Sequence, residues 1–403
     1  MDKTRQKKSP FSRLFAGRKG RTTDNKYDYY DFSLLAVIIL LTCFGLVMLY
    51  STSAYMAEMD FHDDMHYFRR QALISVFSIA MAIIISRIDY HILSNFTTIA
   101  YFGSLFLMAL VKTPLGVTSH GARRWLGVTE TISFQPAEVA KIALILYLAQ
   151  LIVTMGRSIR STRAFFLMLI AGGLQAFAAY AFTDNLSTAI IILGITVGMV
   201  FIAHPNRRLF WMMMGAGAVV VLIAVAFIMT TMQGSDNFRI QRILVWLHPE
   251  DYASGDGYQT LQALYAIGSG GFFGRGLGNS IQKLGSVPEA QNDFIFSIIC
   301  EELGMVGGII VLLFFGYLLY RLFFIAQNAS DMYGSLIVTG IFIHIALQVI
   351  LNIAVVLNIL PNTGVTLPFI SYGGTSVLFL MAEMGLALSV ARKIRLQDTQ
   401  VLL

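Results

Sequence analysis

Ten apolar stretches, most of them close to 20 residues long, follow one another along this chain and limit what it can fold into. Hydrophobic residues make up 56% of the 403 positions and charged residues only 13%, which is more apolar surface than a soluble domain can bury. A helix of about 20 such residues crosses the hydrocarbon core of a bilayer. The sequence therefore predicts an all-α polytopic membrane protein with about ten transmembrane helices, at roughly 32–51, 71–86, 92–111, 137–155, 164–182, 186–203, 208–231, 294–324, 334–357 and 367–391.

Polar segments divide the chain around these helices. A basic tail, residues 1–31, precedes a membrane domain at 32–395, and a short tail, residues 396–403, follows it. The connection 232–293, between the seventh and eighth helices, is predicted to be a large extracytoplasmic loop. A connection of this length tends to be functional. No cleavable signal peptide is recognisable, so we expect the first apolar stretch to act as an uncleaved anchor.

The distribution of Lys and Arg predicts the orientation of the helices. If the N-terminus is cytoplasmic, 19 of the 29 basic residues fall on cytoplasmic segments, nine on outer loops, and Lys141 within a helix. The positive-inside rule therefore places both termini in the cytoplasm. Attraction to anionic lipid or plain solvation explains the basic tail, and we expect no nucleic-acid partner.

The segment "VPEAQNDFIFSIICEELG", residues 287–304, has carboxylates on both sides of an apolar run. Asp293 could cap a helix beginning at Phe294. On that helix the small residues Ser297, Cys300 and Gly304 would share its face, which is typical of a polar cavity wall. A carboxylate placed there can serve as a general base.

Two further acids lie deeper in this predicted helix, at Glu301 and Glu302. Charged groups within membrane helices need partners. We expect these two side chains to have structural roles and to form hydrogen bonds with neighbouring helices.

A second charged pair occurs in "FQPAEVAK", residues 134–141. Pro136 begins a helix, and Glu138 lies in its first turn, where the helix dipole favours an anion. Lys141 follows three residues later on the same face. Two structural explanations are an intrahelical ion pair and a lysine that extends to the membrane surface. At this depth, however, a cation usually faces a bundle interior or a wet cavity and marks a functional site.

Three other segments on the outer side are candidates for ligand contact. "GARRWLG", residues 121–127, presents two arginines and an indole that suit a pyrophosphate or a sugar, or else an interfacial aromatic belt. The glycine-rich segment 266–280 could cradle a phosphate or simply form turns. In "LPNTGVTLPFISYGGTS", residues 360–376, prolines and glycines break the helix at membrane depth, which requires surrounding protein or a wet cavity.

These motifs resemble those of the SEDS family (shape, elongation, division and sporulation), bacterial polytopic glycosyltransferases that polymerise lipid II into peptidoglycan. The resemblance covers the chain from about Tyr27 onward and rests on "GARRW", "QPAEVAK", "PEAQNDFIFSIICEELG" and "PNTGVTLPFISYGGTS" in this order. "GRGLGNSIQKLG" favours the division and sporulation branch. The chain departs from the family pattern at Ala137, Asn185, Gln291 and Asn292, and no role is carried over to Asn185.

The resemblance implies a role for particular residues. Asp293 corresponds to the catalytic aspartate, which would take the proton from the C4 hydroxyl of the acceptor GlcNAc. That hydroxyl would attack the anomeric carbon of the lipid-linked MurNAc donor, and undecaprenyl pyrophosphate would leave. A divalent cation (Mg²⁺ or Mn²⁺) could help to neutralise this leaving group. The predicted substrate-binding residues are Glu138, Lys141, Arg123, Arg124, Trp125, Glu289, Arg275, Lys283, Ser371 and Tyr372.

The family also implies partners and a location. These are a class B penicillin-binding transpeptidase, divisome regulators, and the bacterial cytoplasmic membrane, with the division septum as the site of action. Two other functions remain open from the residues alone. A transporter of lipid-linked precursors needs polar residues through both leaflets, whereas the candidate residues here gather on the outer half. A non-catalytic scaffold would tolerate replacement of Asp293.

Overall fold

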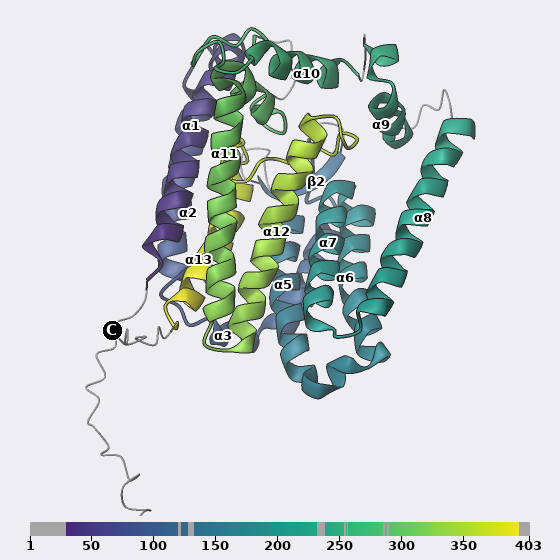
Figure 1. The fold of residues 1–403 in the computed structure, drawn as a ribbon. Coiled ribbons are helices and arrows are strands. Elements are labelled where there is room, and N and C mark those ends of the chain that lie inside the picture. The colour runs from purple at the N-terminus through teal and green to yellow at the C-terminus, as the bar shows by residue number, and fades with distance from the viewer. Residues whose placement is uncertain are drawn as a thin grey trace, which may run out of the picture.

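The computed structural model describes residues 30–119, 122–127, 133–231, 238–253, 255, 257–284, 287 and 290–394. Within them, eight helices are long and apolar enough to cross a membrane, and two shorter apolar helices complete the ten that were predicted. Figure 1 shows most of them as one upright bundle, with α8 leaning away from the others at one side. The eight are α1 (Phe32–Phe61), α2 (His66–Ile85), α5 (Pro136–Met155), α6 (Thr162–Thr183), α7 (Leu186–Ala203), α8 (Arg207–Thr231), α11 (Ile295–Asn328) and α12 (Met332–Val356), and the shorter two are α4 (Thr97–Leu110), preceded by the single turn α3 (His91–Ser94), and α13 (Thr375–Ala391).

Small residues let several of these helices approach closely, as is common in membrane bundles. On α7, Gly194 and Gly198 lie against Leu347 and Ile343 of α12. Gly340 of α12 lies in turn against Ile145 of α5. Because α12 contacts both α5 and α7, it lies at the centre of the bundle and brings residues from distant parts of the sequence together.

Two predicted helix boundaries differ most from the structure. α1 continues to Phe61, ten residues past the predicted end, and reaches the level of α10 in Figure 1. The last helix begins at Thr375 rather than at residue 367. The preceding segment turns through positive φ angles at Gly364, Phe369 and Gly374, which a continuous helix cannot accommodate.

The connection between α4 and α5 contains a small antiparallel sheet that the sequence analysis did not predict. Its strands are β1 (Gly116–Ser119), β2 (Ala122–Gly127) and β3 (Ser133–Phe134), in the order β1-β2-β3. Residues 123–125, which were expected to contact substrate, lie on the central strand β2. The sheet therefore holds them on a rigid element rather than on an open loop.

The long connection between α8 and α11 forms short helices across the same end of the bundle, which we call the outer end in line with the predicted orientation. These are α9 (Phe238–Leu247), the 3₁₀ turn η3 (Pro249–Tyr252) and α10 (Tyr258–Gly270). In Figure 1 they lie above the membrane-spanning helices. Trp246 Nε1 of α9 donates a hydrogen bond to the carbonyl of Asn358, 3.1 Å away, so α9 is tied to the loop that follows α12.

Candidate functional site

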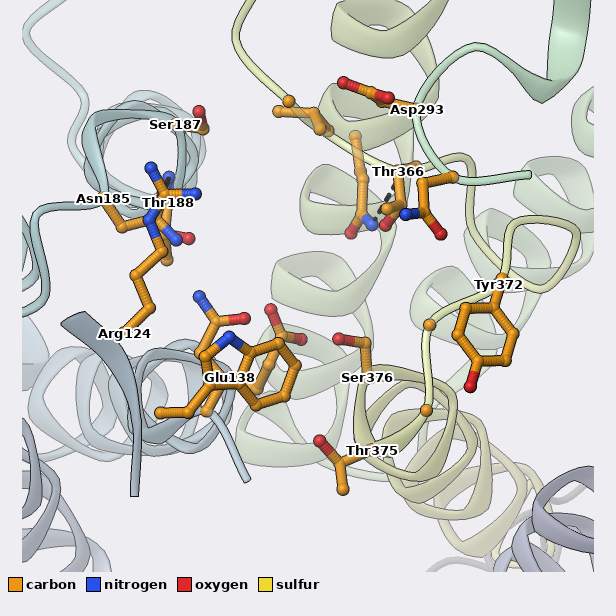
Figure 2. Close-up of a pocket in the computed structure, with 18 of the residues that line it drawn as sticks. Arg124, Glu138, Asn185, Ser187, Thr188, Asp293, Thr366, Tyr372, Thr375 and Ser376 are labelled. Carbon is orange, nitrogen blue, oxygen red and sulfur yellow. Dashed lines mark hydrogen bonds between the residues drawn. The ribbon is translucent and has the colours of Figure 1, made fainter. Parts of the chain in front are cut away.

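A cavity of about 770 Å³ opens at the outer end of the bundle. Its wall combines the N-terminal turns of α2, α5, α7 and α13 with the β-sheet, α9, α10, α12 and the segment 361–374. Figure 2 shows polar side chains from these elements pointing into the cavity. A cavity of this size and polarity can bind a small molecule or a polar head group.

The predicted pair Glu138 and Lys141 lies on the wall of this cavity. Lys141 Nζ is 2.9 Å from Glu138 Oε1, and the two residues are only 2% and 8% exposed. The intrahelical ion pair considered from the sequence is therefore formed, and it faces the cavity as well. A buried cation at a cavity wall can bind an anionic ligand, provided that it remains charged.

Asp293 lines the same cavity from the opposite side and comes from the turn before α11. Asn352 Nδ2 of α12 donates hydrogen bonds of 2.7 Å to the backbone carbonyls of Asp293 and Val365. This amide fixes the Asp293 backbone beside the segment 361–374. The structure thus brings Asp293, Glu138 and Lys141 to one cavity, although they come from distant segments of the chain.

The local structure around Asp293 differs from the one predicted. The residue at the helix N-cap is Phe294, so Asp293 does not cap α11. The expected face of Asp293, Ser297, Cys300 and Gly304 does not form, because Asp293 precedes the helix and Gly304 interrupts it with φ 69° and ψ −172°. Ser297 Oγ instead donates to the carbonyl of Phe294. The cavity wall near Asp293 is built by other elements.

Three arginines contribute positive charge to the cavity. Arg124 was predicted, whereas Arg70 at the start of α2 and Arg242 on α9 were not. Arg242 Nη1 donates to the carbonyl of Asn362 at 3.2 Å, and Arg124 Nη2 to that of Asp184 at 3.4 Å. In the sequence, both Arg70 and Arg242 fall in predicted outer connections, where a basic residue is common, so no sequence signal separated them from other surface arginines.

The remaining predicted substrate contacts fall into two groups. Trp125 and Tyr372 line the cavity, and burial raises the pKa of the Tyr372 hydroxyl. Arg123 and Ser371 do not line the described part of the cavity. Arg123 Nη1 donates to the carbonyl of Lys112, and buried Ser371 Oγ accepts from the Leu367 amide at 2.8 Å.

Arg275 and Lys283 lie away from this cavity, in the segment that follows α10. Lys283 Nζ is 2.8 Å from Glu302 Oε1, and Arg275 Nη1 is 3.5 Å from Glu301 Oε1. Both cations thus pair with acids of α11 instead of lining the described part of the cavity. Glu289, the last of the predicted contacts, lies outside the described residues.

Polar residues of α7 and α12 complete the cavity, and the sequence analysis gave them no role. Asn185 caps α7 by accepting from the Thr188 amide at 3.0 Å, and both residues line the cavity. Gln348 Nε2 donates to the carbonyl of Thr366 at 3.1 Å. A single Asn or Gln in an apolar helix is a weak indication of a functional site, because most such side chains only form a hydrogen bond with a neighbouring backbone group.

The described residues contain no group of three or more His, Cys, Asp or Glu side chains that could hold a metal ion by themselves. The cavity does offer the carboxylate of Asp293, whereas that of Glu138 is paired with Lys141. Mg²⁺ is often bound by one or two carboxylates together with the phosphates of a substrate. The donor set therefore fits a metal ion that arrives with a phosphorylated ligand.

Fold and site together define an all-α membrane protein with an acidic and basic cavity at one end of its helix bundle. Residues 31–396 match the FtsW, RodA and SpoVE family, described as "Cell cycle protein". The chain belongs to this family, which is the SEDS family that its motifs resemble.

Known proteins support this assignment. The chain is 37% identical to "Stage V sporulation protein E" of Bacillus subtilis (strain 168), over 90% of this chain and 97% of that protein. It is 36% identical to "Probable peptidoglycan glycosyltransferase FtsW" of Trichlorobacter lovleyi, over 91% and 94%. A chain of the structure described as "Structural coordination of polymerization and crosslinking by a peptidoglycan synthase complex" superimposes with a TM-score of 0.74 at 27% identity, over 90% and 98%.

Proposed function

We propose that this protein is a peptidoglycan glycosyltransferase that polymerises lipid II at the outer face of the cytoplasmic membrane during cell division. The observation that carries the proposal is the joint placement of Asp293, Glu138 and Lys141 on one cavity. Relatives named as probable peptidoglycan glycosyltransferases support the reaction class.

In the proposed reaction, Asp293 accepts the proton of the C4 hydroxyl of the acceptor GlcNAc. The hydroxyl oxygen then forms a bond with the anomeric carbon of the lipid-linked MurNAc, and the bond from that carbon to undecaprenyl pyrophosphate breaks. A positioned base contributes a factor of roughly 10² to 10⁴ to such a step. Glu138 is less suited to this role, because its carboxylate is engaged by Lys141 at 2.9 Å.

The cations of the cavity would neutralise the departing pyrophosphate. Arg124 and Lys141 lie on the sheet and α5, and Arg70 and Arg242 lie on α2 and α9. Guanidinium groups match phosphate oxygens in pairs, and fixed positive charge stabilises the additional negative charge that develops on the pyrophosphate as its bond to the anomeric carbon breaks. A divalent cation held by Asp293 and the phosphates would supply further positive charge.

The peptidoglycan product requires crosslinking, which this cavity does not provide. We propose that a class B penicillin-binding transpeptidase performs that step as a partner, together with divisome regulators that set the place and time of synthesis. The similarity to a chain of a peptidoglycan synthase complex supports a partner of this kind. The division septum is the proposed location.

The activity is tested with the purified full-length chain and lipid II in detergent or vesicles, with and without the transpeptidase. Formation of glycan polymer supports the proposal. If the chain instead moves fluorescent lipid II between leaflets and forms no polymer in the presence of the partner, it is a transporter. Failure of both activities, with intact partner binding, identifies a scaffold.

The proposed reaction also requires the cavity to face outward. In a background without Cys43 and Cys300, a cysteine at exposed Asp251 of η3 should react with a membrane-impermeant thiol reagent on intact cells. Reaction only after lysis would reverse the orientation and exclude synthesis at the outer face.

A further inference from the structure

The glycine-rich segment after α10 does not belong to the cavity, and its contacts give it another role. Residues 271–276 lie against the interruption of α11 at Gly304. The amides of Arg275 and Gly276 donate to the carbonyls of Glu301 and Glu302 at 3.0 and 2.9 Å, and the Val306 amide donates to the carbonyl of Phe272 at 3.2 Å. The segment is thus fixed to the wall of the bundle by its backbone.

Two glycines make this close approach possible. Both Gly274 and Gly304 have positive φ, 78° and 69°. A Cβ atom on Gly274 would lie 2.2 Å from the carbonyl oxygen of Glu302, and one on Gly304 would lie 2.4 Å from the Gly274 nitrogen. Any larger residue would separate the two backbones, so the segment is built for this contact.

Two polar side chains of the segment, Ser280 and Lys283, are buried. Lys283 donates to Glu302 Oε1 at 2.8 Å and to Ser51 Oγ of α1 at 2.9 Å. Glu301 accepts hydrogen bonds from Ser280 Oγ and from the Ile281 amide. Glu301 and Glu302 of α11 therefore bind the buried polar groups of the segment.

Five apolar side chains of the segment are strongly exposed, beside the exposed polar residues Arg275 and Asn279. These five apolar side chains are between 50% and 82% exposed. Single exposed apolar residues are common on protein surfaces, whereas several in one short segment need an explanation. We call the five the apolar face of segment 271–284, and they are Phe272, Phe273, Leu277, Ile281 and Leu284.

Two contacts between α1 and α11 allow the depth of this apolar face in the membrane to be estimated. The helices lie side by side and are joined at one end by Arg321 and Asp31, 2.7 Å apart, and at the other by Glu302 and Ser51. The 19 residues from Glu302 to Arg321 span about 28 Å of helix, which is close to the thickness of the hydrocarbon core, about 30 Å. If the Asp31 contact lies at the inner boundary, Glu302 lies at the outer one.

Phe272 lies level with Val306, because its carbonyl accepts a hydrogen bond from the Val306 amide. Val306 is about one helical turn from Glu302, towards the centre of the membrane. We propose that the apolar face of segment 271–284 inserts into the outer leaflet, where it forms an interfacial anchor for the loop leading to Asp293. Phe and Leu side chains of segments that lie in the membrane interface insert at this level of the bilayer. The cations of the segment, Arg275 and Lys283, are paired with Glu301 and Glu302. The proposal does not depend on the enzymatic activity.

The test uses a nitroxide spin label on Phe273→Cys, in a Cys43→Ser/Cys300→Ala background of the full-length chain. The protein is reconstituted in vesicles of phosphatidylethanolamine and phosphatidylglycerol. Collisions with O₂, which concentrates in lipid, are compared with collisions with a water-soluble nickel chelate. Leu313→Cys, exposed on the middle of α11, is the lipid control, and Asp251→Cys, exposed in η3, is the water control.

We expect the O₂-to-nickel ratio at position 273 to exceed that at position 251 several-fold and to lie below that at position 313. A ratio equal to that at position 251 would overturn the proposal. Low accessibility to both reagents would also overturn it, because a partner protein or second copy would then cover the face. Leu277→Cys provides an independent reading if the Phe273→Cys variant does not fold.

Discussion

The acids of the motif at residues 287–304 lie only a few positions apart and meet opposite environments. Asp293 lines a cavity of about 770 Å³, whereas Glu302 is fully buried and contacts Lys283 and Ser51. The turn before α11 causes this difference, because it directs one acid towards the cavity and leaves the other within the helix wall. Two carboxylates of one motif thus line a cavity at one position and join neighbouring segments at the other.

A second comparison shows that burial alone does not separate these roles. The Lys141–Glu138 and Lys283–Glu302 pairs have similar distances, 2.9 and 2.8 Å, and all four residues are at most 8% exposed. Only the first pair lies on the cavity. We therefore expect position relative to the cavity, rather than the presence of an ion pair, to decide which lysine affects the reaction.

Replacing Lys141 tests the cavity pair. Lys141→Met should lower the polymerisation rate by about 10²-fold or more, because a fixed charge facing the leaving group is lost. It also leaves Glu138 buried without its cation, which costs stability. The measurement is glycan polymer formed from lipid II per folded molecule.

The double variant Glu138→Gln/Lys141→Met separates the two effects. It removes both charges and should regain thermal stability towards that of the wild type without regaining activity. Near-normal polymerisation by either variant would show that the pair is structural and that the cavity assignment is wrong.

The corresponding change in the other pair should affect folding instead of the reaction. Lys283→Met leaves Glu302 buried and unpaired, which typically costs about 3–5 kcal/mol. We expect a lower unfolding temperature and easier proteolysis of the outer loops, with polymerisation per folded molecule close to that of the wild type. A selective loss of activity at unchanged stability would instead return Lys283 to the substrate contacts predicted from sequence.

Arg275→Ala should have the smallest effect. Its guanidinium group is 3.5 Å from Glu301 and its side chain is 35% exposed. Buried Glu301 keeps its hydrogen bonds from Ser280 Oγ and the Ile281 amide without this arginine, so we expect a smaller loss than for Lys283→Met. Thermal unfolding of the purified variant should shift by a few degrees at most. A large destabilisation would mean that the segment after α10 depends on this contact as well as on its backbone hydrogen bonds.

The sequence predicted the ten helices because apolar runs report membrane crossing directly. It also singled out Asp293, Glu138 and Lys141, since ionisable groups near apolar helices require an explanation. It did not predict that Arg70 and Arg242 would join them, because α2 and α9 reach the cavity only through the packing of the bundle. The interruption at Gly304 was also missed, since a glycine within an apolar run does not reveal its φ angle.

The most direct test of the central claim compares two carboxylates of one motif under identical conditions. Asp293→Asn and Glu302→Gln each remove one negative charge with little change of shape, and the rate of lipid II polymerisation is measured per folded, partner-bound molecule. We expect Asp293→Asn to lose a factor of roughly 10² to 10⁴ at near-wild-type stability, while Glu302→Gln is less stable but active once folded. Wild-type polymerisation by well-folded Asp293→Asn would contradict the account.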